Sequence, residues 1–224
     1  METVLLIGVR GGIGKAIKKS LTLKYTLECF NSKILDLSNE KSVNSFISNK
    51  KSKYNHVIFT AGINELVSFK RITHKMIKKT MNINLLNFLV LLSSLLNKNF
   101  KNKNASVTMI SSLYGSFGRE NRLPYVISKH AMNGACKTLA IELGKIGIRV
   151  NTISPGFINT DLTKKNLTSS EIKDIENKIP LKRLGMPSDI ANMVRFLISK
   201  EAKYISGSDI VIDGGYSSGA FMGV

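Results

Sequence analysis

Short apolar runs alternate with longer amphipathic stretches along the whole chain. The apolar runs predict strands at 3–8, 25–30, 56–62, 106–112, 148–156 and 209–215. Apolar residues that recur with the helical period predict helices at 12–24, 40–50, 73–99, 124–146, 169–179 and 187–199. Strands that alternate with helices in this way are typical of βαβ units, which build a mostly parallel sheet with helices on both faces. The 224 residues are enough for one domain with a full core, so we expect a single α/β domain over 1–224.

Two places depart from the regular alternation. The apolar run 33–37 follows the strand at 25–30 almost at once, whereas a parallel neighbour needs a crossover of roughly a dozen residues. We therefore expect no helix there and a third strand that is absent or vestigial, so that the fold is shortened after the second strand. The helix over 73–99 is expected to break near the segment 81–84, "MNIN".

Composition places the chain among ordinary cytoplasmic proteins. No leader is visible, because the apolar start ends at Arg10 in a glycine-rich loop. The most apolar run, 83–96, is short and contains Asn87 and two serines, which favours a buried or interface helix over a membrane span. Cys29 and Cys136 lie far apart without metal-ligand spacing, and we expect both to be buried, reduced thiols. The three histidines form no cluster in the sequence, so no metal site is expected.

The chain is strongly basic, with a formal net charge of +18 from 33 basic and 15 acidic residues. Such a charge can attract nucleic acid, anionic membranes or acidic partners. The lysines are spread along the chain among asparagine, serine and isoleucine, which favours a compositional bias over a dedicated polyanion site. Without clustered arginines or a set of stacking aromatic residues, a nucleic-acid partner is not expected.

Two local patterns carry candidate chemistry. Gly8, Gly12 and Gly14 lie between the first strand and its helix, where glycines allow a tight turn and the close approach of a phosphate to the helix N-terminus. Tyr125 and Lys129 are four positions apart in a predicted helix, so they share a face. A lysine near a phenol favours the phenolate, and a tyrosine with a lowered pKa can pass protons at neutral pH. Alone, each pattern is also compatible with a plain glycine turn or an ordinary surface pair.

Taken in order, these and further motifs resemble the short-chain dehydrogenase/reductase family over nearly the whole chain. The glycine loop resembles its cofactor loop, "TAG" at 60–62 its NAG turn, and "ISGSDIVIDGG" at 205–215 its last strand. Its catalytic set of Asn, Ser, Tyr and Lys corresponds to Asn84, Ser112, Tyr125 and Lys129. The segments "PGFINTDL" and "PLKRLGMPSDIANMVRFLIS" are most similar to the 3-oxoacyl-acyl carrier protein reductases. The resemblance implies a Rossmann-like, doubly wound fold.

The resemblance also implies the reaction. Tyr125 would be the general acid for carbonyl reduction, and Lys129 would lower its pKa and hold the nicotinamide ribose. Ser112 would donate a hydrogen bond to the substrate oxygen, and Asn84 would hold a water relay to Lys129. The expected substrate is a small or carrier-linked carbonyl compound, in the first place a 3-oxoacyl thioester. The alternatives are a sugar or another small secondary alcohol or ketone, and a catalytically silent regulator, which the complete catalytic set disfavours.

NADP(H) is favoured as the cofactor, with NAD(H) possible. In NAD enzymes an acidic residue after the second strand binds the ribose 2′-hydroxyl, and a basic group accommodates the 2′-phosphate in NADP enzymes. Here that stretch is Asn31, Ser32 and Lys33, with Arg10 nearby and Glu28 inside the strand. The residues expected to bind the cofactor are Gly8, Arg10, Gly12, Ile13, Gly14, Asn31, Ser32, Lys33, Asp36, Leu37, Ala61, Gly62, Tyr125, Lys129, Pro155, Gly156, Ile158 and Thr160.

Three further expectations concern two residues that differ from the family's usual ones, a segment over the substrate pocket, and assembly. Ile7 and Thr60 replace the Thr and Asn usual in the family, and we expect the two positions to compensate for each other across neighbouring strands. The segment 157–186 corresponds to the family's substrate lid. Family members commonly pair two helices across a two-fold axis, so we expect a homotetramer, with a homodimer as the alternative. An acidic carrier protein bearing the substrate would be attracted by the +18 charge.

Overall fold

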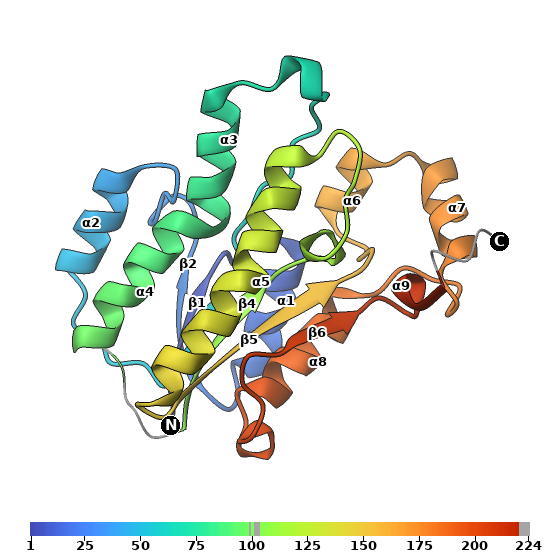
Figure 1. Cartoon of the computed structure of the whole chain (residues 1–224). Helices are drawn as coiled ribbons and strands as arrows, with labels where there is room; N and C mark the ends of the chain where they lie inside the picture. The colour runs from blue at the N-terminus through green and yellow to red at the C-terminus, as the bar shows by residue number, and fades with distance from the viewer. Residues whose placement is uncertain (99, 101–103, 220–224) are drawn as a thin grey trace.

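The carboxyl ends of parallel strands meet at one edge of a central sheet in this protein. The computed structural model describes residues 1–98, 100 and 104–219, and within these residues the sheet has six parallel strands in the order β2-β1-β3-β4-β5-β6 (Figure 1). The strands are β1 (Thr3–Ile7), β2 (Thr26–Phe30), β3 (His56–Phe59), β4 (Ala105–Ile110), β5 (Ile148–Pro155) and β6 (Asp209–Ile212). The predicted Rossmann-like α/β class is confirmed.

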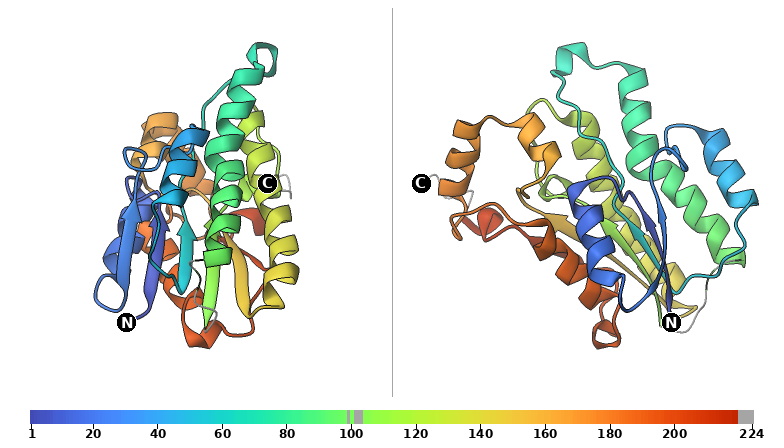
Figure 2. Two further views of the ribbon diagram at one scale, coloured as in Figure 1. Left: turned by 90° about the vertical axis from the view of Figure 1, so that its left-hand side faces the viewer. Right: turned by 180° about the vertical axis from the view of Figure 1, so that it is seen from behind.

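Helices cover both faces of the sheet (Figure 2). One layer contains α2 (Glu40–Ser48), α4 (Asn87–Lys98) and α5 (Leu123–Gly144). The other contains α1 (Gly12–Leu21) and α8 (Pro187–Leu197), which contact each other. Every residue of the central strands β3, β4 and β5 is buried, as expected for strands covered on both faces.

The register aligns the strand ends that carry the site. Ile7 of β1 pairs with Phe59 of β3, and Phe59 pairs with Met109 of β4. The residues that follow these strands therefore emerge side by side at one edge. In open α/β sheets, this edge is where ligands bind.

The link between β2 and α2 confirms the shortened fold. Residues 31–39 form turns without a helix or a strand, so β2 is an edge strand that pairs only with β1. Asn39 ends the link, and its side chain accepts a hydrogen bond from the Lys41 N–H as the N-cap of α2.

The long helical stretch is interrupted where the sequence predicted, but by a π-helical turn and not by a loop. The helix α3 (His74–Met81) continues through a π-helical turn, η2 (Asn82–Leu86), directly into α4. By length and composition, His74–Asn97 could also cross a membrane. Half of its most apolar window is buried against the rest of the molecule, as in the core helix of a globular domain.

The segment after β5 folds as two short helices, α6 (Asp161–Asn166) and α7 (Ser169–Lys178), followed by α8. The predicted helix at 169–179 corresponds to α7, which Thr168 and Glu171 cap reciprocally. The sequence did not predict α6, the terminal turn α9 (Tyr216–Gly219), or the 3₁₀ turns η1 (Phe69–Arg71), η3 (Leu113–Gly115) and η4 (Lys200–Ala202).

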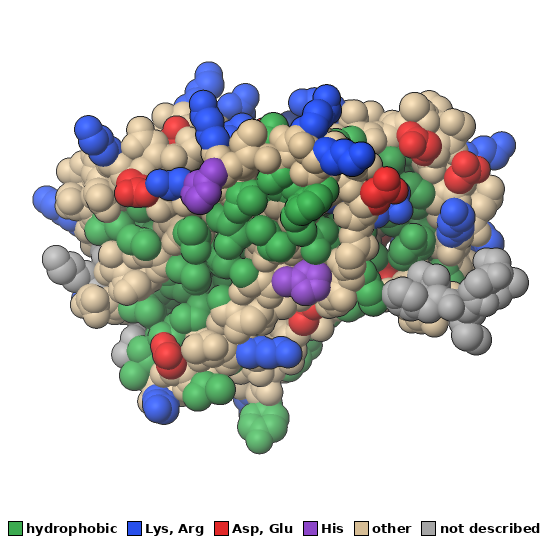
Figure 3. Space-filling view, turned by 45° about the horizontal axis from the view of Figure 1, so that its top comes forward, with side chains coloured by type: hydrophobic (Ala, Val, Ile, Leu, Met, Phe, Trp, Pro, Cys, Tyr) green, Lys and Arg blue, Asp and Glu red, His purple; other side chains and the backbone are tan. Residues whose placement is uncertain are grey.

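An apolar surface lies on the outside of the layer formed by α4 and α5. Figure 3 shows hydrophobic side chains gathered on this face, with many of the Lys and Arg side chains along its upper rim. Leu86, Val90 and Ile141 are among the exposed large hydrophobic residues here.

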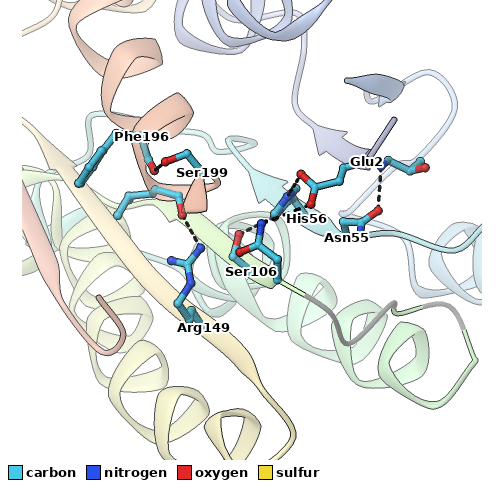
Figure 4. A network of polar contacts seen from close by, with 10 residues as sticks. Glu2, Asn55, His56, Ser106, Arg149, Phe196 and Ser199 are labelled. Carbon is cyan, nitrogen blue, oxygen red and sulfur yellow. Dashed lines mark hydrogen bonds and ion pairs between the residues drawn. The ribbon is translucent and has the colours of Figure 1, made fainter. Parts of the chain in front are cut away.

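The buried polar groups at the opposite edge of the sheet are structural. Figure 4 shows His56 between Ser106, whose Oγ lies 2.8 Å from its Nδ1, and Glu2, whose carboxylate lies 3.4 Å from its Nε2. Burial lowers the pKa of His56, so the ring is neutral at pH 7. Among the described residues no group of His, Cys, Asp and Glu could hold a metal ion.

The cysteines follow the prediction only in part. Cys136 is buried, as expected, and burial raises the pKa of its thiol to about 11. Cys29 is partly exposed, so the prediction of a buried thiol was wrong there. The reason is its position in the edge strand β2, none of whose residues is fully buried.

Candidate active site

A single groove runs along the carboxyl ends of β1, β3, β4 and β5. Its two halves share Thr60, Gly62 and Ile63. The first half, here called the cofactor half, is lined by Ile7, Gly8, Arg10, Gly11, Asn31, Ser32, Leu35, Asp36, Leu37, Ala61 and Ile83 besides the shared residues. The second, here called the catalytic half, includes Ser112, Tyr125 and Lys129. Most of the sequence-predicted catalytic and cofactor residues therefore line two adjoining halves of one site.

The glycine loop forms a cradle that side chains would fill. Gly8 has φ +104°, and a Cβ there would lie 2.5 Å from the Ala61 nitrogen. A Cβ on Gly14 would lie 2.2 Å from the Gly8 carbonyl oxygen, so α1 and β1 approach too closely for any other residue. The N-cap of α1, Gly11, has no side-chain cap, and the first turn holds no acidic residue. The free N–H groups and the helix dipole suit a phosphate, and the groove fits a dinucleotide.

Thr60, which follows β3, links that strand to the end of β1 at the glycine loop. Its hydroxyl lies 2.9 Å from the Gly8 carbonyl oxygen and 3.2 Å from that of Ile7, and it can donate to either. Positions 7 and 60 are therefore linked through the Thr60 side chain and the backbone at the end of β1. The Ile7 side chain takes no part in these bonds.

Ser112, Tyr125 and Lys129 converge from two elements. Ser112 follows β4 and caps η3, because its Oγ accepts the Tyr114 N–H at 3.2 Å. Tyr125 and Lys129 lie one turn apart in α5, and Lys129 Nζ is 5.6 Å from the centre of the Tyr125 ring. The predicted shared face is confirmed.

The protonation of this pair differs from the sequence prediction. Burial raises the pKa of Tyr125, while a hydrogen bond from Ser112 and the positive charge of Arg122 act in the opposite direction. Burial also lowers the pKa of Lys129 to about 7, and its Nζ donates to the Ile110 carbonyl oxygen at 2.7 Å. The expected lowering of the Tyr125 pKa by Lys129 is therefore wrong for the chain without cofactor, because the buried lysine loses its own charge near neutrality. Tyr125 keeps its proton at pH 7, as a general acid requires.

Asn84 lies behind the groove and does not line it. It is fully buried in the π-helical turn, where its Oδ1 accepts the Ile63 N–H at 2.8 Å. Its Nδ2 donates to the Ile63 carbonyl oxygen at 3.0 Å and to Ser128 Oγ at 2.9 Å. Asn84 thus ties the loop after β3 to α5, and its part in a water relay stays a prediction.

Most predicted cofactor residues line the groove. In the catalytic half these are Ile13, Gly62, Tyr125, Lys129, Pro155, Gly156, Ile158 and Thr160. In the cofactor half they are Gly8, Arg10, Asn31, Ser32, Asp36, Leu37, Ala61 and Gly62. Gly12, Gly14 and Lys33 line neither half. A Cβ on Gly12 would lie 2.9 Å from Thr160 Cγ2, so this glycine serves close packing with the lid.

Several residues that line the catalytic half were not named from the sequence, although those from Phe157 onward lie in the predicted lid segment 157–186. They are Ile63, Asn64, Ile110, Ser111, Tyr114, Arg122, Phe157, Leu162, Thr163, Asn166 and Leu167. Most are apolar or neutral lid and loop residues, whose contribution depends on how the chain folds over the groove. Arg122 offered a signal, because it precedes Tyr125 by one helical turn and therefore lies near it.

Comparisons with known proteins identify the family. A family model described as enoyl-(acyl carrier protein) reductase matches residues 15–217. A crystal structure of a short chain dehydrogenase family protein from Francisella tularensis superposes with a TM-score of 0.87 at 28% sequence identity, covering 97% of this chain and 99% of that one. The chain belongs to the short-chain dehydrogenase/reductase family and is an NAD(P)-dependent oxidoreductase.

Individual relatives narrow the comparison. The 3-oxoacyl-(acyl-carrier-protein) reductase FabG of Rickettsia felis is 33% identical over 238 aligned residues, which cover 96% of each chain. That of Aquifex aeolicus is 32% identical over 218 residues, covering 96% of this chain and 87% of the relative. Among solved structures, 4-hydroxyisoleucine dehydrogenase complexed with NADH has a TM-score of 0.88 at 28% identity, covering 98% of this chain and 100% of that one.

Proposed function

We propose that this protein reduces a carbonyl group to a secondary alcohol with NADPH, and that Tyr125 is the general acid. The observation that carries the proposal is the convergence of Ser112, Tyr125 and Lys129 in one half of a groove whose other half is a glycine-lined phosphate cradle. A bound nicotinamide cofactor supplies the hydride. The complete set argues against a silent regulator.

Each side chain has a distinct task. Tyr125 holds a proton on its phenol oxygen and gives it to the substrate oxygen. Ser112 accepts the Tyr114 N–H and hydrogen-bonds to Tyr125, and when substrate binds, its hydroxyl donates instead to the substrate oxygen as negative charge develops. Lys129, whose pKa burial lowers to about 7, gains charge when an anionic or hydroxyl-rich ligand lies against it.

The proposed substrate is a 3-oxoacyl thioester or a compound like it. The support is the similarity to 3-oxoacyl-(acyl-carrier-protein) reductases at about one-third identity over nearly the full length. The alternative is a sugar or another small secondary alcohol or ketone, which the likeness to 4-hydroxyisoleucine dehydrogenase favours. We also propose a cytoplasmic location and assembly as a homotetramer or homodimer.

NADPH is the proposed donor because of the charges in the cofactor half of the groove. Arg10 lines this half. The carboxylate of Asp36 also lines it, but it already accepts hydrogen bonds from the Ser38 N–H and hydroxyl. The other nearby acid, Glu28, pairs with Lys50 and accepts the Tyr54 hydroxyl at 2.9 Å. The solved relatives with NADH make the preference worth measuring.

Dissociation constants for NADPH and NADH test this preference. The Arg10→Ala variant should narrow the preference for NADPH by more than Lys33→Ala does, because Arg10 lines the groove and Lys33 does not. Tighter binding of NADH by the wild-type protein, or no effect of either change, would contradict the assignment.

The Tyr125→Phe variant tests the catalytic proposal. Loss of the proton donor should reduce the rate of NADPH oxidation with a 3-oxoacyl thioester or a small ketone by at least about 100-fold. NADPH binding, followed by fluorescence, should change little, because the phenol oxygen is not part of the phosphate cradle. Near-normal turnover by the variant would remove Tyr125 from the mechanism.

A further inference from the structure

Arg122 is a buried cation in the catalytic half of the groove, and one of its nitrogens has no hydrogen-bond partner among the described residues. The residue is 7% exposed, and its Nη1 has no hydrogen-bond partner among the residues that the structure describes. It lines the same half of the groove as Ser112 and Tyr125, immediately before the first residue of α5. The guanidinium therefore lies at the substrate end of the site.

No acidic residue among those described as lining this half of the groove balances this charge. The residues that line this half of the groove include no Asp or Glu. The ring of Tyr114 lies beneath the guanidinium, but its centre is 6.0 Å from Arg122 Cζ, at the limit of a cation–π contact. A buried cation without a counter-ion is costly, so a protein keeps one mainly where a ligand brings the opposite charge.

The position also favours an anion from the substrate over one from the cofactor. The phosphate cradle belongs to the cofactor half of the groove, which Arg122 does not line. Arg122 is the N-cap residue of the 22-residue helix α5 and has no side-chain cap, so the positive end of that helix dipole adds to its charge. A guanidinium offers the two parallel donors that match a carboxylate.

We propose that Arg122 binds a carboxylate of the substrate, so that the site takes a small oxo acid in preference to an uncharged ketone or thioester. In the reverse direction the substrate is the matching hydroxy acid. The inference rests on the proposed carbonyl chemistry. It favours the alternative substrate class, the small ketones, over the thioester that similarity to relatives suggested, and it adds that the ketone carries a carboxylate. Asn64 and Ser111 also present buried side-chain oxygens without partners in this half of the groove, which suits a polar ligand.

The first experiment compares each oxo acid with its methyl ester. The probes are pyruvate, acetoacetate and levulinate, their methyl esters, and acetoacetyl-N-acetylcysteamine as the thioester. For at least one acid, wild-type kcat/KM should exceed that of its ester and of the thioester by roughly 10- to 100-fold, the value of a hydrogen-bonded charge. In Arg122→Gln the ratio of kcat/KM for the acid to that for its ester should fall by a similar factor. Arg122→Lys keeps the charge but not the two parallel donors, so its ratio should lie between those of the wild type and Arg122→Gln.

The matched control is Arg119→Gln. Arg119 carries the same charge three positions earlier, is exposed and does not line the groove. Its charge acts on Arg122 only through space, so its removal should change the acid-to-ester ratio much less than Arg122→Gln does. Loss of acid and ester reduction by the same factor in Arg122→Gln would assign the arginine to folding and overturn the proposal. A thioester reduced faster than every acid would also overturn it, while the proposed carbonyl chemistry would stand.

A binding measurement separates this inference from the reaction itself. Acetoacetate is titrated calorimetrically into the complex of the protein with NADP⁺, which has no hydride to give. Binding by the wild type and Arg119→Gln, with loss in Arg122→Gln, supports the carboxylate site even if no substrate is turned over. Equal binding by all three proteins, or none by any with each of the three acids, overturns it.

Discussion

The chemistry of the groove depends on the protonation of two neighbouring buried side chains, Tyr125 and Lys129. The spacing of Tyr125 and Lys129 predicted that they share a face, because helical geometry is local. Their protonation could not be predicted in the same way, because it depends on burial by segments far away in the chain. Burial of the ammonium and the phenol in the same groove reversed the expected shift of the Tyr125 pKa. Arg122 escaped notice for the same reason, since no local pattern shows that an arginine is buried with a nitrogen that has no hydrogen-bond partner among the described residues.

Lys129 should make the stability of the cofactor-free protein depend on pH. Its pKa is about 7 in the folded chain against 10.5 for an unperturbed lysine. Between these values the unfolded chain binds more protons, so the free energy of unfolding should rise as pH increases from about 7 towards 10. In Lys129→Met this contribution is absent, and the pH dependence should be flatter.

Urea unfolding of both proteins without cofactor measures this difference. Groups such as Cys136 titrate in both and cancel in the comparison. Parallel curves for the wild type and the variant would mean that Lys129 keeps its charge in the empty site.

Secondary-structure elements were predictable where the number of residues alone limits which element can form. The link of residues 31–39 is too short for a parallel crossover, and the structure has neither helix nor strand there. The π-helical turn was not predictable as such, because the apolar period continues through it. The turn is held by bonds from Asn84 to Ile63 and Ser128, which are distant in sequence. The helix α6 was also missed, because it is a single short segment whose cap, Thr160, belongs to a loop over the groove.

Asn84 should therefore be worth more to stability than one polar contact. Asn84→Ala removes three hydrogen bonds and leaves the Ile63 N–H and carbonyl without their present partner. We expect the free energy of unfolding to fall by about 2 kcal/mol or more. The comparison is Ser128→Ala, which removes one of the same bonds together with a bond to the Tyr125 carbonyl oxygen and should cost about 1 kcal/mol. Equal losses in urea unfolding would show that the backbone of Ile63 finds water instead.

At the scale of the whole molecule, the alternation of strands and helices along the sequence predicted the fold class. The apolar face on the surface could be found only from the structure. The outer face of α4 and α5 exposes half of Val90 and 69% of Ile141. Apolar faces of this kind usually meet a partner. The net charge of +18 opposes association between copies, but salt at physiological strength screens it beyond about 8 Å.

We therefore expect light scattering to give a mass of a tetramer, or of a dimer, of the 24.7 kDa chain. The double variant Val90→Lys, Ile141→Lys should dissociate it, because four or more added charges would face one another across the contact. Leu23→Lys is the control, since Leu23 is 91% exposed and follows α1 on the other face of the sheet. A wild-type monomer at micromolar concentration in moderate salt would contradict the expectation.

The shared wall of the groove has a kinetic consequence. Because Thr60, Gly62 and Ile63 belong to both halves, a dinucleotide that lies along the groove completes the inner side of the compartment in which the substrate reacts. A substrate that arrived first would find that side missing and would stand in the path of the nicotinamide end. We therefore expect the coenzyme to bind first and to leave last. If binding is ordered in this way, the cell's ratio of reduced to oxidised coenzyme determines which coenzyme complex of the enzyme is populated. That ratio would then determine whether the protein reduces a carbonyl or oxidises an alcohol.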